Sequence, residues 1–255
     1  QVRLGQLEDV ARSEGEDIGL RVFVGQRSAT ISSSNMNPDI LAGLVTRAID
    51  MAKEAPEDQY AGLAPQDRLL TGAVPDFDGD DGLDPDPALL RAAALECENA
   101  ARAVAGVTNS EGAGASAGRS IFALATSHGF AGVKSGSGYG MSASVLSGDG
   151  DAKERDYDWR TTRHLADLDS PFNIGTRAGE RAVKRLNPGT VKSGQMPVVF
   201  DPRVGGSFVG HLLGGIGGSS IARKTSFLLE SLGAQLFDSS ISIVDDPHRM
   251  RGIGS

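Results

Sequence analysis

The stretch VVFDPRVGGSFVGHLLGGIGGSSIARK, residues 198–224, decides the fold that we predict for this chain. It begins with a buried-strand pattern at Val198–Phe200 and stops at Asp201-Pro202. A Gly-rich amphipathic segment that carries one histidine, His211, comes next. A strand that delivers a His-bearing helix to the middle of a domain is a common way to build a metal site, so metal chemistry is the first function to test.

The helix lacks the other groups that a zinc peptidase needs. Such a helix carries two histidines on one face, with a carboxylate beside the first to take a proton from the metal-bound water. Here Leu212 follows His211, and Ile216 stands where a widened HExxxH motif has its second ligand. One neutral imidazole does not hold zinc against water. We therefore predict a degenerate zinc motif at His211, Leu212 and Ile216, with no catalytic residue, metal ligand or cofactor in this chain.

His211 and its glycine neighbours also fit a purely structural role. A histidine on an apolar helix face is more often a hydrogen-bonded packing residue than a ligand, and we favour that role here. Four nearby glycines let the helix approach another backbone, at a cost of about 1 kcal/mol each relative to alanine: Gly214, Gly215, Gly217 and Gly218. Tight packing or a partner must compensate for that cost.

The rest of the chain predicts an α+β fold. Alternating or apolar runs predict strands over residues 1–10, 18–34, 107–114, 119–127, 130–148, 152–159 and 240–244, with a two-residue hairpin at Gly25-Gln26. Apolar stripes at helical spacing predict helices that begin at Pro38 and end before Pro56, and that cover 87–104 and 171–186. Short turns between long strands indicate an antiparallel sheet packed with helices.

Asn187-Pro188-Gly189 is the best candidate for a domain boundary, because breakers end a helix just before a new strand pattern. We expect an N-terminal α+β domain over 1–188 and the beginning of a β-rich C-terminal domain over 189–255. The first residues already alternate like a strand, and the sequence stops at Gly-Ser. We therefore expect both ends to belong to a longer protein.

The composition of the chain excludes several classes of function. The formal charge of -8 and pI near 5.0, without clustered Lys or Arg, argue against direct nucleic-acid binding. The single cysteine, Cys97, lies in an Ala-rich helix, where we expect a small buried hydrophobe rather than a reactive thiol. Neither a signal peptide nor a run of about 18 apolar residues occurs. These features predict a cytoplasmic protein that does not enter membranes.

Three motifs resemble binding or catalytic sites but lack the context. Residues 76–86 are acidic, yet Asp81 and Pro87 occupy the glycine and final glutamate positions of a calcium loop, so we predict a solvated linker that caps the next helix. Ser116 lies in a GxSxG match, but a strand pattern follows it, which predicts a hairpin turn and no nucleophile. No helix follows the glycines of 136–140, so we predict a flexible strand or bulge and no phosphate loop.

Charged and imidazole groups elsewhere suggest no site. His128, His164 and His248 have no metal-pair spacing with one another or with His211. Asp245-Asp246-Pro247 favours a turn after a strand. The third helix has a basic outward face, which we interpret as solvated: Arg177, Glu180, Arg181, Lys184 and Arg185.

Nearly the whole chain resembles the TldD/PmbA family, long called modulators of DNA gyrase. The segments that carry the resemblance are EDVARSEGEDIGLRVFVG, APEDQYAGLA, GVTNSEGAGAS, ALATSHGFAG, ERDYDW, RHLADLDSP, AGERAVKRLNP, PVVFDPRVGGSFVGHLLGGIGG and VDDPHRMRGIGS. In that family one subunit type carries HExxxH with a distal cysteine and is a zinc peptidase, whereas the PmbA (TldE) type lacks the motif. Leu212 and Ile216 place this chain with the second type, and residues 189–255 with the beginning of a peptidase-like domain.

The resemblance implies a non-catalytic subunit of a two-component zinc metallopeptidase that acts on unfolded peptides. The zinc and the catalytic glutamate would belong to a TldD-type partner. This chain would pair with that subunit in a heterodimer, form a homodimer, or do both. Peptides could be held by strand addition to a sheet edge. A stand-alone peptide-binding or scaffolding homodimer without a peptidase role remains the alternative.

Overall fold

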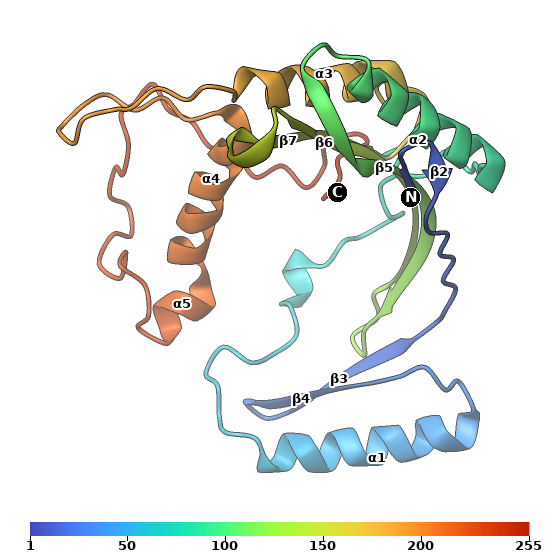
Figure 1. Cartoon of the computed structure of the whole chain (residues 1–255). Helices are drawn as coiled ribbons and strands as arrows, with labels where there is room; N and C mark the ends of the chain where they lie inside the picture. Colours follow the sequence, from blue (N-terminus) through green and yellow to red (C-terminus); the bar gives the residue numbers. More distant parts are fainter. Residues whose placement is uncertain (255) are drawn as a thin grey trace. The chain divides into compact units, whose positions relative to one another are not determined.

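The structure is a computed structural model that describes residues 1–254. Contacts divide the chain into two compact units (Figure 1). The first contains residues 1–187 and 247–255, and the second contains residues 188–246.

A β-hairpin with one helix forms the earlier part of the first unit. Strands β3 (Ile18–Val24) and β4 (Arg27–Ser33) pair through Gly25-Gln26, which confirms the predicted hairpin. Helix α1 (Pro38–Glu54) begins at the Asn37 cap, whose side chain accepts a hydrogen bond from the N–H of Asp39. Its buried residues recur every four positions, at Leu44, Ala48 and Ala52. This apolar stripe is the one that the sequence predicts.

A five-stranded antiparallel sheet forms the centre of the first unit, which confirms the predicted α+β class. Its order is β2-β1-β5-β6-β7, and the strands are β1 (Val2–Arg3), β2 (Gln6–Leu7), β5 (Val107–Ala125), β6 (Ala131–Ser147) and β7 (Glu154–Thr162). The strand predicted over 1–10 is broken at Leu4-Gly5, where both residues have positive φ. Single turns of 3₁₀ helix cover Gln66–Arg68, Gly150–Ala152 and Leu165–Asp167.

The hairpin turn predicted at Gly114–Gly118 is wrong. These residues lie inside β5, which runs unbroken from Val107 to Ala125 apart from register shifts before Gly112. The small residues lie opposite another small tract on β6, since Ser116 pairs with Gly140 and Ser120 with Gly136. We interpreted these glycines as turn residues, but their backbone groups belong to a continuous ladder of pairs with β6. The strand predicted across 136–140 is confirmed.

Two helices cover one face of the sheet and form the core with it. Helices α2 (Pro87–Arg102) and α3 (Pro171–Lys184) contact each other and the strands β5, β6 and β7 (Figure 1). Cys97 is fully buried in this core, and burial raises the pKa of its thiol to about 12, so the predicted inert cysteine is confirmed. A Cβ on Gly175 would clash with the backbone oxygen of Cys97, which shows how closely the two helices approach.

The solvated basic face predicted for α3 is wrong, because its arginines pair with acids on β7. Asp158 accepts hydrogen bonds from Arg177 (2.6 Å) and from Arg181, and Arg185 reaches Glu154 at 3.2 Å. Arginines four apart on a helix rise about 6 Å per step, and acids two apart on a strand about 6.8 Å. The two periods are close enough that Arg177 and Arg181 both reach Asp158, and Arg185 lies near Glu154 and within 3.8 Å of Asp156. Burial opposes ionisation of Asp158, but these arginines outweigh it and lower the pKa of its carboxyl group.

The acidic segment is bound to the sheet, so the predicted solvated linker is wrong for its central part. The N–H of Ser137 donates to the backbone oxygen of Gly79 (2.9 Å), and Tyr139 Oη donates to Asp81 (2.5 Å). Asp81 also accepts from the N–H of Leu165 at 2.9 Å. Burial would raise the pKa of Asp81, but these hydrogen bonds together lower it to about 2. Asp86 caps α2 as predicted.

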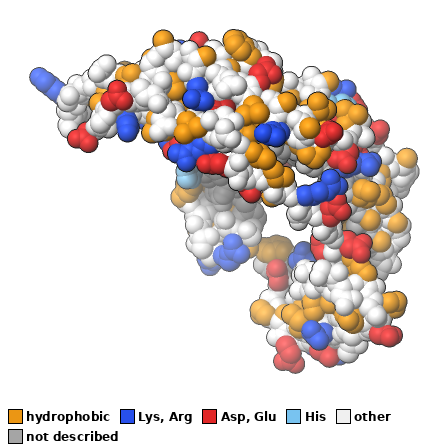
Figure 2. Space-filling model, turned by 45° about the vertical axis from the view of Figure 1, so that its right-hand side comes forward, with side chains coloured by type: hydrophobic (Ala, Val, Ile, Leu, Met, Phe, Trp, Pro, Cys, Tyr) orange, Lys and Arg blue, Asp and Glu red, His pale blue; other side chains and the backbone are white. Residues whose placement is uncertain are grey.

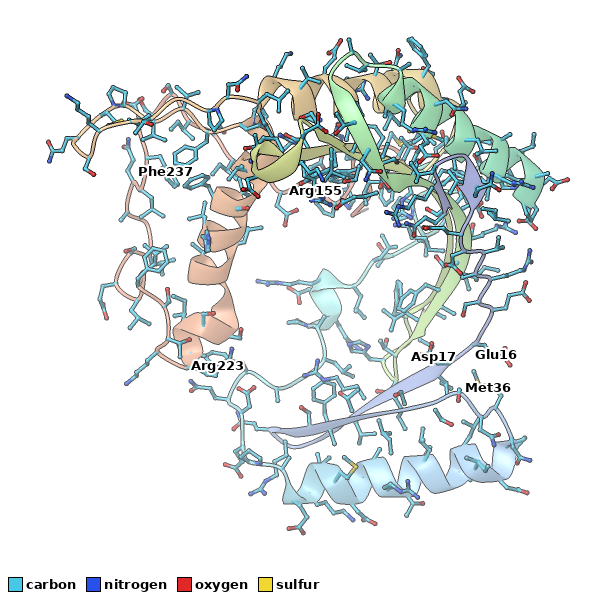
Figure 3. All side chains as sticks on the ribbon, in the orientation of Figure 1. Glu16, Asp17, Met36, Arg155, Arg223 and Phe237 are labelled. Carbon is cyan, nitrogen blue, oxygen red and sulfur yellow. The ribbon has the colours of Figure 1, made fainter. Side chains whose placement is uncertain are left out.

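The second unit contains two helices, α4 (Pro202–Ile216) and α5 (Gly218–Ala222), and little buried surface. The buried strand predicted at Val198–Phe200 is wrong, because this segment has no strand pairing and Val199 is 95% exposed. The strand predicted over 240–244 is absent for the same reason. Figure 3 labels Arg223, just after α5, and Phe237 in the segment that follows. No helix within residues 1–254 is long and apolar enough to span a membrane.

Candidate functional site on helix α4

Local sequence signals account for the helix that carries the degenerate zinc motif. Asp201 caps α4 by accepting a hydrogen bond from the N–H of Arg203 at 2.9 Å, and Pro202 occupies the first turn. Gly217 ends the helix. The predicted helix is therefore confirmed, although the buried strand that was to deliver it is not.

The three motif positions lie along the second half of α4. His211 is exposed and forms no hydrogen bond or ion pair with another residue of 1–254, so it does not fill the hydrogen-bonded packing role that we favoured. Leu212 is half-buried, and Ile216 is 50% exposed. Neither Leu212 nor Ile216 has a lone pair to offer a metal ion. The zinc that the family motif would hold therefore does not fit this donor set.

One of the motif glycines makes a close contact. The space around Gly215 is tight, since an added Cβ would lie 3.1 Å from the Phe227 ring and 3.2 Å from the Leu228 side chain. Ser226 Oγ donates to the backbone oxygen of Gly215 at 2.6 Å, which fixes this loop against the helix. Added Cβ atoms on Gly214 and Gly218 would meet no atom within 4 Å. The predicted close approach thus occurs at Gly215.

Apolar side chains surround α4 and remain exposed. Phe200 and Phe208 form an edge-to-face pair with centroids 4.6 Å apart, yet both rings are more than half exposed. The other exposed apolar residues of the helix are Val204, Val209, Leu213 and Ile216. A helix that is apolar all round is normally buried. Helix α4 therefore presents apolar surface that the contacts of the second unit leave exposed.

The other histidines have local partners in the first unit. His128 lies 3.0 Å from Thr126 Oγ1 and 2.9 Å from the backbone oxygen of Ala64. His164 Nε2 lies 2.8 Å from the backbone oxygen of Asp78, and His248 stacks on Phe77 with centroids 5.3 Å apart. Among residues 1–254, no group of three or more His, Cys, Asp or Glu side chains could hold a metal ion.

Ser116 lies on a regular strand rather than on a strained elbow. It pairs with Gly140 in the β5–β6 ladder, and no helix follows it. An added Cβ on Gly140 would lie 2.8 Å from Ser116 Oγ, so the hydroxyl group points across the sheet face at that glycine. The geometry of a serine nucleophile is absent.

Comparisons with known proteins give the class of this chain. Three domains of one family match in order: PmbA/TldA metallopeptidase domain 1 over residues 1–52, the central domain over 80–186 and the C-terminal domain over 193–255. Metalloprotease PmbA of Escherichia coli is 31% identical over 255 residues, which cover 99% of this chain and 56% of that protein. The PmbA homolog of Haemophilus influenzae is 32% identical over 254 residues, with the same two coverages of 99% and 56%.

Solved structures show the same fold. A proposed modulator of DNA gyrase from Bacteroides thetaiotaomicron superposes with a TM-score of 0.82 at 25% identity, over 91% of this chain and 54% of that one. TldE from Thermococcus kodakarensis superposes with a TM-score of 0.70 at 17% identity, over 90% and 52%. The chain is therefore a peptidase-like protein. It belongs to the PmbA/TldD family, and it spans just over half the length of the curated relatives that it matches.

Proposed function

We propose that this chain is part of a non-catalytic, cytoplasmic subunit of a two-component zinc peptidase that acts on unfolded peptides. The observation that carries the proposal is the pair Leu212 and Ile216, which stand where the zinc motif needs a glutamate and a histidine. A methyl group neither binds zinc nor accepts a proton. The metal ligands and the general base would belong to a TldD-type partner subunit.

The surface of α4 supports the need for a partner or for further chain. Its exposed apolar side chains would be covered in an assembly, and the charged surface offers no competing function. Figure 2 shows acidic and basic side chains interspersed with apolar ones, without a wide patch of one sign on the face that it displays. An assembly in which this chain supplies enclosure and peptide binding fits both features. A stand-alone peptide-binding homodimer is the competing proposal.

Zinc analysis coupled to a peptidase assay separates the two. The full chain, alone and mixed with a zinc-bearing family member, is assayed for bound zinc and for cleavage of an unfolded peptide. We expect no stoichiometric zinc and no cleavage by the chain alone, and faster cleavage by the mixture than by the zinc subunit alone. A mixture no faster than the zinc subunit favours the stand-alone homodimer. One zinc per chain, or unaided cleavage, contradicts the non-catalytic role.

A gain-of-ligand variant tests the motif positions directly. Leu212→Glu combined with Ile216→His places a glutamate beside His211 and a second imidazole five residues further on, about 1.4 turns. We expect at least tenfold tighter zinc binding than in the unaltered chain, measured by competition with a chromogenic chelator. The matched control is Val204→His with Leu213→Glu, which adds the same groups nine residues apart on opposite faces of the helix, where they cannot share one ion. Equal zinc binding by both variants would show that α4 does not hold the family's motif geometry.

A further inference from the structure

The second unit is joined to the first unit at both of its ends. The chain leaves the first unit at Asn187, shortly after α3, and returns to it at Pro247 (Figure 1). Residues 247–254, which we call the return segment, therefore belong to the first unit although the 59 residues before them do not. Helix α4 lies in the part of the chain between these two attachments. What holds the return segment thus determines how the unit that carries α4 is attached.

One arginine makes the central contacts of the return segment. The N–H of Arg251 donates to the backbone oxygen of Phe77 at 2.8 Å. Its guanidinium group lies 2.6 Å from Asp78 and 2.9 Å from Asp167, so one cation joins two acidic side chains from separate parts of the first unit. All three charged side chains are about 40% exposed, at 42%, 39% and 44%. Salt screens ion pairs that are open to solvent to this degree.

The remaining contacts of the return segment are also polar or lie at the surface. Arg163 donates to the backbone oxygen of Ile253 at 2.6 Å, and the ring of His248 stacks on Phe77. The apolar side chains of the segment stay largely in solvent, since Met250 is 59% exposed and Ile253 is 55% exposed. No residue of 247–254 is buried. Ionic and hydrogen-bonded contacts, rather than burial of apolar surface, therefore hold the segment in place.

The two residues at the centre of this contact have strained backbones. Asp78 and Arg251 each have a φ of 53°, in the left-handed region that disfavours residues with a side chain. Release of the return segment would free Arg251 from this conformation. Strain that favours release therefore opposes contacts that are open to solvent, and segments held in this way open locally without unfolding of the core.

We propose that the return segment is a salt-sensitive latch, closed when Arg251 binds Asp78 and Asp167 and open when these ion pairs are screened. In the open state the second unit stays joined to the first through Asn187 alone. The latch concerns the attachment of the second unit, so it holds or fails independently of the proposed peptidase role. His164 lies 3.2 Å from Asp78 and would add charge there if protonated, so the latch is tested at a single pH.

Hydrogen–deuterium exchange of the full chain, followed by mass spectrometry, measures the opening of the latch. We expect the amides of 249–253 to exchange at least twofold faster at about 0.5 M than at about 0.05 M NaCl, where the Debye length is about three times as long. Asp78→Asn combined with Asp167→Asn removes both charges and keeps the side-chain size, and asparagine tolerates the left-handed conformation. In this variant we expect at least fivefold faster exchange of 249–253 and no further effect of salt, with the amides of α2 and α3 as protected as before.

Asp50→Asn combined with Asp151→Asn is the matched control, because it removes the same charge at two exposed positions outside the latch. We expect exchange of 249–253 in this control to match the unaltered chain. Unchanged exchange in Asp78→Asn with Asp167→Asn overturns the proposal, as does exchange in the unaltered chain that salt does not alter. Equal acceleration in the control would assign the effect to net charge and also overturn it. Loss of protection in α2 and α3 together with 249–253 would show that the contact belongs to the core and is not a separate latch.

Discussion

Helices α3 and α4 begin with the same local device but differ in what surrounds them. Ser170-Pro171 opens α3 and Asp201-Pro202 opens α4, each with the capping side chain bonded to a backbone N–H of the first turn. Helix α3 buries five residues against α2 and the sheet, whereas α4 buries Gly215 alone. A cap therefore determines where a helix begins, whereas packing against the rest of the chain determines how much the helix contributes to the stability of the fold.

The glycines of the two helices show the same contrast. Added Cβ atoms on Gly175 and Gly179 of α3 would collide with backbone oxygens of α2, while those on Gly206, Gly210 and Gly214 of α4 would meet no atom within 4 Å. The two glycines of α3 are required because α2 crosses closely there. The three glycines of α4 have no atom of residues 1–254 in the space that a Cβ would fill. The first unit is thus stabilised by its own contacts, whereas α4 presents apolar surface that the contacts of the second unit leave exposed.

The largest expected effect comes from removing the buried carboxylate that joins β7 to α3. Asp158→Ala leaves Arg177 and Arg181 without their shared partner, and the side chain of Asp158 is only 2% exposed. Breaking a buried ion pair from one side costs about 3–5 kcal/mol. Urea unfolding of the full chain measures the loss.

Arg203→Ala is the control from the other helix, where Arg203 pairs with the half-exposed side chain of Asp201. We expect this variant to lose less than about 1 kcal/mol. If Asp158→Ala and Arg203→Ala lower the free energy of unfolding by the same amount, α3 and α4 do not differ in the way that their burial indicates.

A smaller effect is expected from closing the glycine crossing. Gly175→Ala places a methyl group against the backbone of Cys97 and Ala101, and overpacking of this kind costs about 1–3 kcal/mol. Gly210→Ala has open space around it and gains about 1 kcal/mol of helix propensity. Opposite signs of the change in unfolding free energy would sharpen the contrast between α3 and α4. A loss at Gly210 would show that a close partner covers that face.

Most of the fold was predictable because its signals are local. The prolines that open them and the apolar stripes behind those prolines predicted three helices of the first unit, and Gly25-Gln26 predicted a hairpin. Errors arose where pairing is long-range. Gly114–Gly118 could not be recognised as mid-strand without the β6 tract opposite it, and the arginines of α3 could not be placed without the acids of β7.

The candidate site was predictable in a different sense. The spacing of His211, Leu212 and Ile216 identifies a motif that lacks its ligands. This conclusion follows from the residue types alone, because neither leucine nor isoleucine can bind a metal ion. The open outer edge of β5 left no comparable signal, because it arises where β5 continues beyond β1, which pairs with it at Ala113 alone. The alternating small residues from Ala113 to Gly118 were visible, but they were interpreted as a turn.

The smallest expected effect concerns the bond between Tyr139 and the acidic segment. Burial and the Asp81 carboxylate raise the pKa of Tyr139 to about 12, while the pKa of Asp81 falls from an ordinary 3.8 to about 2. A depressed acid pKa gives stability that is fully present above about pH 4 and is lost as the pH falls toward 2. Tyr139→Phe removes one donor to Asp81, so we expect about 1 kcal/mol lower stability at pH 7.

The same substitution should move the acid-induced loss of stability to higher pH, because the pKa of Asp81 then lies nearer its ordinary value. Unfolding free energies measured from pH 7 down to pH 2 test both expectations. Tyr60→Phe is the control, since Tyr60 is 72% exposed and its hydroxyl group has no partner among residues 1–254. If both variants follow the unaltered chain through acid, the contact of Asp81 with Tyr139 does not hold the acidic segment on the sheet. A shift in the pH of this loss that occurs only in Tyr139→Phe would show that the contact of Asp81 with Tyr139 helps to hold the acidic segment on the sheet.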